Sequence, residues 1–175
     1  TNISAWDERI RLFEQAQDRI IMSTFDIRPG ESAKDVLAML LHKAEEGVKV
    51  QVLVDGISGL IRMEGEELFY AVSSHPNVEF KIYNMLNPLQ LWKSQGRMHD
   101  KYIIVDDLAY VLGGRNTFDY FIGDYATNDR SRDREVLVYN TKQGEAEDHT
   151  SSLWQVESYF KKIWDLDVCT YFHND

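Results

Sequence analysis

The residues best suited to chemistry lie in one short run, 97–116, which the pattern predicts to be a strand, a turn and a second strand. His99, Lys101 and Asn116 supply an imidazole, a cation and a carboxamide within this run. Such a set suits attack on a phosphodiester, with the imidazole as nucleophile and the ammonium and amide holding the non-bridging oxygens. No other segment of the 175 residues offers comparable chemistry.

The spacing within this run agrees with strand geometry. His99 and Lys101 are two residues apart, so on an extended strand their side chains project from the same face. The apolar run 102–105 predicts a strand that is buried on both faces and holds the pair rigidly. Asp106 begins a tight turn, and we expect it to organise the hairpin rather than to take part in chemistry.

Two glycines follow the return strand of the hairpin. Gly113 and Gly114 would let the backbone adopt a positive φ or approach a ligand closely. Asn116 follows on the turn beyond them, where its amide can point back at the same ligand. We therefore expect both glycines to support the motif structurally.

The elements that must position these residues alternate along the chain. Apolar periodicity predicts helices over 5–18, 33–46, 64–73 and 151–165, and strands over 20–27, 49–55, 78–83, 98–105, 109–113 and 135–139. Ser32 is the expected N-cap of the second helix and Gly47 its C′ glycine. Helices between the early strands imply parallel crossovers, and the hairpin adds antiparallel pairing. The prediction is an α/β fold, a mixed β-sheet with helices on both faces.

The order His-x-Lys, four residues, Asp, six residues, Gly-Gly-x-Asn resembles the HKD motif of the phospholipase D superfamily. His99, Lys101 and Asp106 match its three named positions, and residues 113–116 match its Gly-Ser-x-Asn tail. Gly114 departs from the usual serine, so a backbone N–H would have to replace the serine hydroxyl as a phosphate contact.

The rest of the chain supports this resemblance, which extends from about Asp7 to about Trp164. The strand, helix and strand over 20–55 resemble the opening of a phospholipase D half-domain. Within the superfamily, the Gly-Gly-Arg-Asn tail and the segment 132–138 look most like bacterial cardiolipin synthase-type proteins. We expect residues 1–175 to form a single phospholipase D-like half-domain.

The resemblance implies two HKD motifs that face each other across a pseudo-twofold axis. One histidine forms a phosphohistidine, and the other protonates the leaving alcohol and then activates the acceptor. This chain contains one motif, because its other four histidines lack Lys and Asp partners at the required spacing. The second half is expected in the same, longer polypeptide or in a second copy, as in the small secreted endonucleases of the superfamily. The ends at Thr1 and Asp175 favour an excised N-terminal half.

The implied reaction is phosphatidyl transfer or phospholipid hydrolysis, on a substrate such as phosphatidylglycerol. His99 would be the nucleophile or, by pseudo-symmetry, the acid and base, while Lys101 and Asn116 neutralise the phosphoryl oxygens. No metal or other cofactor is expected, because lysines from both halves replace a cation. The alternatives are a homodimeric phosphodiesterase or endonuclease, and a non-catalytic half kept for pairing.

An acidic residue downstream of the motif orients the catalytic histidine in this superfamily. Asp133 and Glu135 have the same parity on the following strand, and we choose Glu135; the alternative is an arginine-paired surface carboxylate. Arg115 and Tyr120 are candidate residues of the substrate entrance. For the aromatic region 119–125, filling of the core is the alternative.

The net charge of −10 argues against nucleic acid as a partner, because a strongly acidic chain repels a polyanion. Six basic residues nevertheless cluster around the motif in sequence: Arg97, Lys101, Arg115, Arg130, Arg132 and Arg134. They form either a local basic groove or a salt-bridged surface. The acidic charge balance favours a small anionic head group as the partner, rather than nucleic acid.

Composition places the chain among globular domains, with 43% hydrophobic and 27% charged residues. A single cysteine excludes a disulfide framework. No apolar run approaches the roughly 20 residues of a membrane span, and no signal peptide is evident. We expect this domain to be soluble and its parent protein to be membrane-associated, at the cytoplasmic or inner-membrane face. The apolar loop 85–95 is either a lip that touches the membrane or a segment packed under the sheet or against the missing half.

Overall fold

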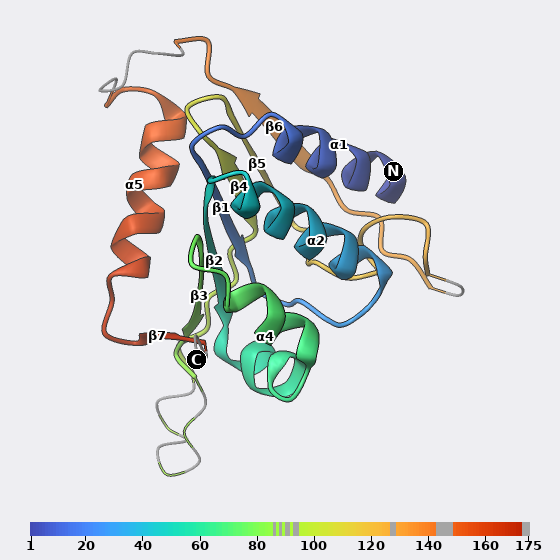
Figure 1. The fold of residues 1–175 in the computed structure, drawn as a ribbon, viewed down its shortest axis with the longest axis vertical. Helices are drawn as coiled ribbons and strands as arrows, with labels where there is room; N and C mark the ends of the chain where they lie inside the picture. The colour runs from blue at the N-terminus through green and yellow to red at the C-terminus, as the bar shows by residue number, and fades with distance from the viewer. Residues whose placement is uncertain are drawn as a thin grey trace.

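The computed structural model describes residues 1–85, 87, 89, 92, 95–126, 129–142 and 149–172. Within these residues, one seven-stranded sheet has the order β6-β5-β4-β1-β2-β3-β7 (Figure 1). The strands are β1 (Arg19–Thr24), β2 (Lys49–Asp55), β3 (Val78–Tyr83), β4 (Tyr102–Val105), β5 (Ala109–Gly113), β6 (Glu135–Tyr139) and β7 (Cys169–Tyr171). The helices are α1 (Asn2–Glu14), α2 (Glu31–Glu45), α3 (Gly56–Ser58), the π-helical η1 (Gly59–Met63), α4 (Glu67–Ser73) and α5 (Ser152–Trp164).

Parallel and antiparallel pairing meet at β1, in the middle of the sheet. Strand β1 runs parallel to β2, which runs parallel to β3, and helices connect these strands. On its other side β1 pairs with β4 in the antiparallel direction, and β5 and β6 continue that pattern. The four residues of β4 are all buried, as expected for a strand covered on both faces.

Helices cover both faces of the sheet. Helices α1 and α2 lie on one face and α5 lies on the other (Figure 1). Successive residues of β1 divide between the two sides: Ile20 and Met22 join the larger core with α2, and Ile21 joins the core with Phe160 of α5. The predicted mixed α/β sheet with helices on both faces is therefore confirmed.

Three elements differ from the sequence prediction. The strand predicted over 98–105 is paired only from Tyr102 onward, because the amide of Met98 donates to the carboxylate of Asp55 instead of to a neighbouring strand. The segment 56–63, which lies between a predicted strand and a predicted helix, forms α3 and η1. The short edge strand β7 was not predicted, since three residues carry too little periodicity.

The two ends of α2 show how local sequence signals succeed and fail. At its end, Gly47 has φ 97° and Val48 N donates to Lys43 O at 3.0 Å, which confirms the C′ glycine. At its start, Ser32 is not the N-cap but lies in the first turn. The distant Asp119 caps the helix, accepting from Ser32 N at 2.8 Å and from Ser32 Oγ at 2.7 Å.

Replacing Asp119 by Ala should destabilise the fold by about 1 kcal/mol, the usual effect of losing an N-cap acceptor. Asn at the same position should keep most of the stability, because its amide oxygen can accept the same bonds. The control is Asp124→Ala in the same segment, whose exposed ion pair with Arg130 is expected to contribute about 0–1 kcal/mol. Urea unfolding measures all three. Equal midpoints for Asp119→Ala and Asp124→Ala would contradict the capping role.

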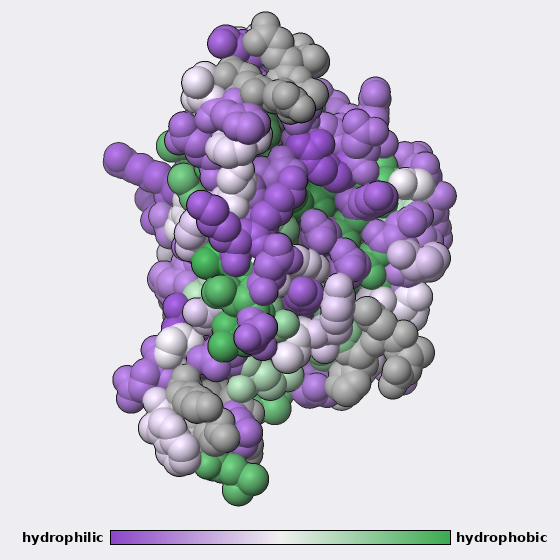
Figure 2. All heavy atoms as spheres, turned by 90° about the vertical axis from the view of Figure 1, so that its left-hand side faces the viewer, coloured by the Kyte–Doolittle hydropathy of each residue, from purple (hydrophilic) through white to green (hydrophobic). Residues whose placement is uncertain are grey.

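Hydrophilic side chains dominate the face formed by α5, with a few apolar patches between them (Figure 2). The abundance of acidic residues fits this polar surface: 29 Asp and Glu against 19 Lys and Arg. Among the helices described, none combines the length and apolar character that a membrane crossing requires.

Candidate active site

The predicted motif histidine lies where the parallel strands end. Tyr102, the first residue of β4, pairs with Ser23 next to the carboxyl end of β1. His99 precedes β4 by three positions and is exposed. Its imidazole is thus presented at the carboxyl end of the central strands, the usual location of sites in open α/β sheets.

His99 and Lys101 are in direct contact. The Nζ atom of Lys101 donates to the carbonyl oxygen of His99 at 2.8 Å and lies 3.2 Å from its Nδ1. Lys101 is only 6% exposed, and desolvation lowers the pKa of its amine, although the carboxylates of Asp100 and Asp133 oppose that shift. A buried lysine is therefore directed at an exposed imidazole, an arrangement suited to a ligand with negative oxygens.

Phe25 belongs to this site and was missed in the sequence. Its ring centroid lies 4.5 Å from that of His99, with the planes tilted by 55°. The Nζ atom of Lys101 lies 5.3 Å from the same ring centroid. Phe25 directly follows β1, so the only available signal was an aromatic residue at a strand end. The ring of Phe25 therefore limits the positions that the His99 imidazole can adopt on one side.

Asn116 is brought to the same strand end through a backbone contact. Its side-chain oxygen accepts from the amide of Asp26 at 3.2 Å, and Asp26 is next to Phe25 in the chain. Because this bond uses the amide oxygen, the NH₂ group is the part of Asn116 suited to hold a phosphoryl oxygen. The three predicted chemical residues thus converge around the end of β1.

The two motif glycines allow a close approach of neighbouring chain rather than a positive φ. A Cβ atom on Gly113 would collide with Glu135 and with the carbonyl of Arg134, and one on Gly114 would collide with the carboxylate of Asp133. The positive-φ glycines of the described chain are found elsewhere. Gly114 thus leaves room for the carboxylate of Asp133 beside the motif tail.

Glu135, chosen as the partner of His99, is instead paired with arginines. Its carboxylate accepts from both Nη atoms of Arg9, one at 2.9 Å, and lies 3.2 Å from Nε of Arg115. All three side chains are buried, with 12% or less of each exposed. Two cations hold this carboxylate. Because Arg9 belongs to α1 and Glu135 to β6, their ion pair ties α1 to the sheet.

Arg115, the other basic partner of Glu135 and a predicted residue of the substrate entrance, is buried. It is 5% exposed, and its guanidinium donates to Asn2 Oδ1 at 2.6 Å, to Phe121 O at 2.7 Å and to Asp133 O at 2.5 Å. These bonds fasten the turn after β5 to the segment that enters β6. In this structure the guanidinium therefore binds protein acceptors, and its place at a substrate entrance stays a prediction.

The carboxylate of Asp106 binds backbone amides of the segment between α1 and β1. It has φ 47°, and its carboxylate accepts from the amides of Gln17, Asp18 and Arg19 at 2.7–3.0 Å. It therefore fixes the connection from α1 to β1 as well as the turn from β4 to β5.

Tyr120, the other candidate residue of the substrate entrance, belongs to a cluster of aromatic rings, and the loop 85–95 exposes two of its apolar side chains. Tyr120 is 40% exposed, and its ring stacks on Phe118 and contacts Phe121. In the loop 85–95, Leu89 and Trp92 are 84% and 71% exposed, so these two do not pack under the sheet. The predicted apolar residues Leu86 and Leu91 lie outside the described residues.

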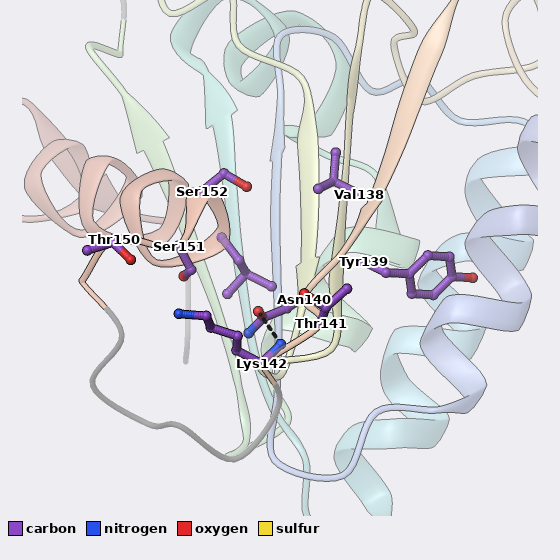
Figure 3. Close-up of a pocket in the computed structure, with 9 residues that line it drawn as sticks. Val138, Tyr139, Asn140, Thr141, Lys142, Thr150, Ser151 and Ser152 are labelled. Carbon is purple, nitrogen blue, oxygen red and sulfur yellow. Dashed lines mark hydrogen bonds between the residues drawn. The ribbon is translucent and has the colours of Figure 1, made fainter.

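A pocket of about 230 Å³ lies between β6 and the start of α5 (Figure 3). Its lining comes from 138–142 and 150–153, and the Asn140 side chain accepts from the Lys142 amide at 3.1 Å. None of the predicted site residues lines it, so it is separate from the motif. Among the described residues, no group of three His, Cys, Asp or Glu side chains is arranged to hold a metal ion.

Comparison with known proteins agrees with the motif and the fold. The family described as "Cardiolipin synthase, PLD-like domain" matches residues 10–164. Cardiolipin synthase from Clostridium perfringens is 26% identical over 171 residues, covering 98% of this chain and 35% of its own length. Cardiolipin synthase C from Escherichia coli is 27% identical over 136 residues, covering 70% and 27%. The chain spans between about a quarter and a third of the length of these curated relatives.

Two solved structures share the fold. NucT from Helicobacter pylori has a TM-score of 0.66 at 20% identity, covering 97% of this chain and 91% of that one. Nuc from Salmonella typhimurium, a phospholipase D family member, has a TM-score of 0.62 at 15% identity, covering 95% and 90%. Together with the family match over residues 10–164, the fold and the motif show that the chain belongs to the phospholipase D-like domains of the cardiolipin synthase family.

Proposed function

We propose that this chain supplies one half of a metal-independent site for phosphatidyl transfer or phospholipid hydrolysis. The observation that carries the proposal is the contact between exposed His99 and buried Lys101, 3.2 Å from Nδ1 to Nζ, beside Asn116 at the same strand end. An imidazole and a desolvated ammonium so arranged suit a tetrahedral phosphodiester.

In the proposed reaction, a ring nitrogen of His99 attacks phosphorus and forms a P–N bond. The P–O bond to the leaving alcohol breaks, and the alkoxide takes a proton from the histidine of the second motif. That histidine then removes a proton from water or an acceptor alcohol, whose oxygen attacks phosphorus and releases His99. Lys101 and Asn116 hold the non-bridging oxygens throughout, and by symmetry the two histidines can exchange roles.

Asp133 replaces Glu135 as the proposed carboxylate that balances the charge on the imidazolium. Glu135 is committed to Arg9 and Arg115, whereas the carboxylate of Asp133 lies against Gly114 in the motif tail and acts on the pKa of Lys101. A carboxylate in this position stabilises cationic groups of the site electrostatically. We assign to it an electrostatic role rather than a direct bond to His99.

Lys101 should titrate below the ordinary lysine value of 10.5, because burial disfavours its charged form. Raising the pH through this lowered pKa removes the cation, so turnover should fall on the alkaline side before the exposed lysines lose their charge. NMR titration of ¹³C-methylated lysine amines measures this directly, with the resonance absent from Lys101→Met giving the assignment. A Lys101 resonance that titrates together with the exposed lysines would contradict the desolvated site.

A homodimeric phosphodiesterase or endonuclease is the second candidate. It is favoured by the likeness to NucT and Nuc, of which this chain covers 91% and 90%. The charge distribution argues against it: Arg97, Arg115 and Arg130 are each paired with a carboxylate, which removes half of the predicted basic cluster. We therefore propose a small phosphate head group, with the second motif in the same polypeptide or a second copy.

The two candidates are separated by substrate and salt. The parent protein and this chain are each tested on phosphatidylglycerol vesicles and on single- and double-stranded DNA. The proposal predicts turnover of the lipid, at a membrane surface, with weak dependence on salt. Cleavage of DNA by this chain as a dimer, with affinity that falls steeply with salt, would establish the second candidate instead.

A further inference from the structure

The segment 96–100, which carries His99, is held by side chains rather than by the sheet, whose backbone contacts begin at Lys101, where the carbonyl oxygen accepts from the amide of Gly113 at 3.2 Å. Its residues precede β4 and have no place in the strand ladders. The side-chain NH₂ of Asn84 donates to the carbonyl of Gly96 at 2.8 Å, and Tyr159 of α5 donates to Asp100 at 2.8 Å. The histidine is thus positioned by a small number of individual contacts.

Asp55 makes the most buried of these contacts. It is the last residue of β2 and is 0% exposed. One carboxylate oxygen accepts from the amide of Met98 at 3.0 Å, next to His99 in the chain. The other oxygen pairs with the guanidinium of Arg97 and accepts from the amide of Ile57, where it caps α3 at 3.1 Å.

This arrangement ties the end of a central strand to the two residues that immediately precede the histidine. Met98 is held at a second point, because its sulfur accepts from the hydroxyl of Ser23 on β1 at 3.4 Å. A buried carboxylate with a cation and two amide donors is strongly localised, since losing any partner leaves a charge without compensation. The backbone at 97–98 therefore cannot shift without disturbing the core end of β2.

We infer that Asp55 is a positioning residue for His99, fixing the imidazole through Arg97 and Met98 without touching the substrate. The inference rests on the proposed function for its catalytic consequence, but the geometric claim concerns His99 alone. A misplacement of about 1 Å in a reacting group can lower turnover by about 100-fold. In the complete two-motif assembly, Asp55→Asn should therefore lower kcat by about 10- to 100-fold and leave KM within about 3-fold.

The direct test is NMR of the chain with ¹⁵N-labelled histidine. Asp55→Asn should move and broaden the imidazole resonances of His99, while the other four histidines serve as internal references and stay in place. The matched control is Glu157→Gln, which disrupts another buried arginine–carboxylate pair. Glu157 is 8% exposed in its side chain and binds Arg19 at the amino end of β1, far from His99. This control should leave the His99 resonances unchanged.

A folded Asp55→Asn chain with unchanged His99 resonances would overturn the inference. If that variant does not fold, Arg97→Gln provides the test, since it removes the ion pair and keeps the carboxylate. It should shift the His99 resonances in the same direction. Unchanged His99 resonances in Arg97→Gln would equally overturn the inference. The outcome is independent of turnover. A wild-type assembly without phosphodiester activity would remove the proposed function, while a shifted His99 in Asp55→Asn would still establish the positioning role.

Discussion

Replacing His99 by Gln is expected to lower phosphodiester turnover by about 1,000-fold or more, because removing a nucleophile eliminates the covalent route. Gln keeps a polar side chain of similar size at an exposed position, so the fold should not change. The contact of Lys101 with the carbonyl of residue 99 does not depend on the imidazole. The loss should therefore appear in kcat, with substrate binding largely retained.

The measurement uses the complete two-motif assembly, whether one polypeptide or two copies, with initial rates on phosphatidylglycerol vesicles. The control is His42→Gln on α2, whose side chain is 61% exposed and forms only an exposed pair with Glu46. That variant should turn over substrate like the wild type. Normal activity of His99→Gln would instead support the remaining alternative, a non-catalytic half kept for pairing.

Replacing Glu135 by Ala is expected to destabilise the fold by about 3–5 kcal/mol. The change leaves the buried guanidiniums of Arg9 and Arg115 without their shared carboxylate. Neither can reach water without moving α1 or the turn after β5. Because a typical domain has only about 5–15 kcal/mol of net stability, the variant should be close to unfolding. Urea denaturation measures the effect.

An exposed ion pair on α1 provides the comparison for the stability effect of Glu135→Ala. Asp7 lies 3.0 Å from Arg11 one turn along α1, with 47% and 71% of the side chains exposed. Removing Asp7 should change the free energy of unfolding by about 0–1 kcal/mol. A similar small effect for Glu135→Ala would mean that the three buried side chains are not a stabilising network. A large loss of activity with full stability would return Glu135 to its first predicted role beside His99.

The sequence predicted the fold well where periodicity was strong. The buried run 102–105, the helices on both faces and the mixed sheet follow from patterns of apolar residues at two- or four-residue spacing. The short motif also allowed a candidate site to be proposed from the sequence, because its residues lie within 18 positions of one another. The contact between His99 and Lys101 is local in sequence, whereas the segment that carries His99 is held by Asp55, Asn84 and Tyr159.

Contacts across long sequence separations could not be predicted in the same way. Glu135 is 126 positions from Arg9, and Ser32 is capped by Asp119, 87 positions away. Which carboxylate meets which cation depends on how the segments pack, and charge alone does not encode it. For the same reason, the contacts of Phe25 and Asp55 with the motif segment could not be predicted. They form only where the ends of β1 and β2 meet that segment.

The proposed phosphohistidine is the central claim, and trapping it is the most direct test. The complete two-motif protein would be mixed with phosphatidylglycerol in the presence of EDTA, quenched in alkali within milliseconds to seconds, digested, and analysed by mass spectrometry. We predict a phosphatidyl or phosphoryl adduct on the peptide that contains His99, and its absence from that peptide in His99→Gln. When the roles are exchanged, the adduct is expected on the histidine of the second motif. An active enzyme without an adduct on either histidine under these conditions would contradict the covalent mechanism.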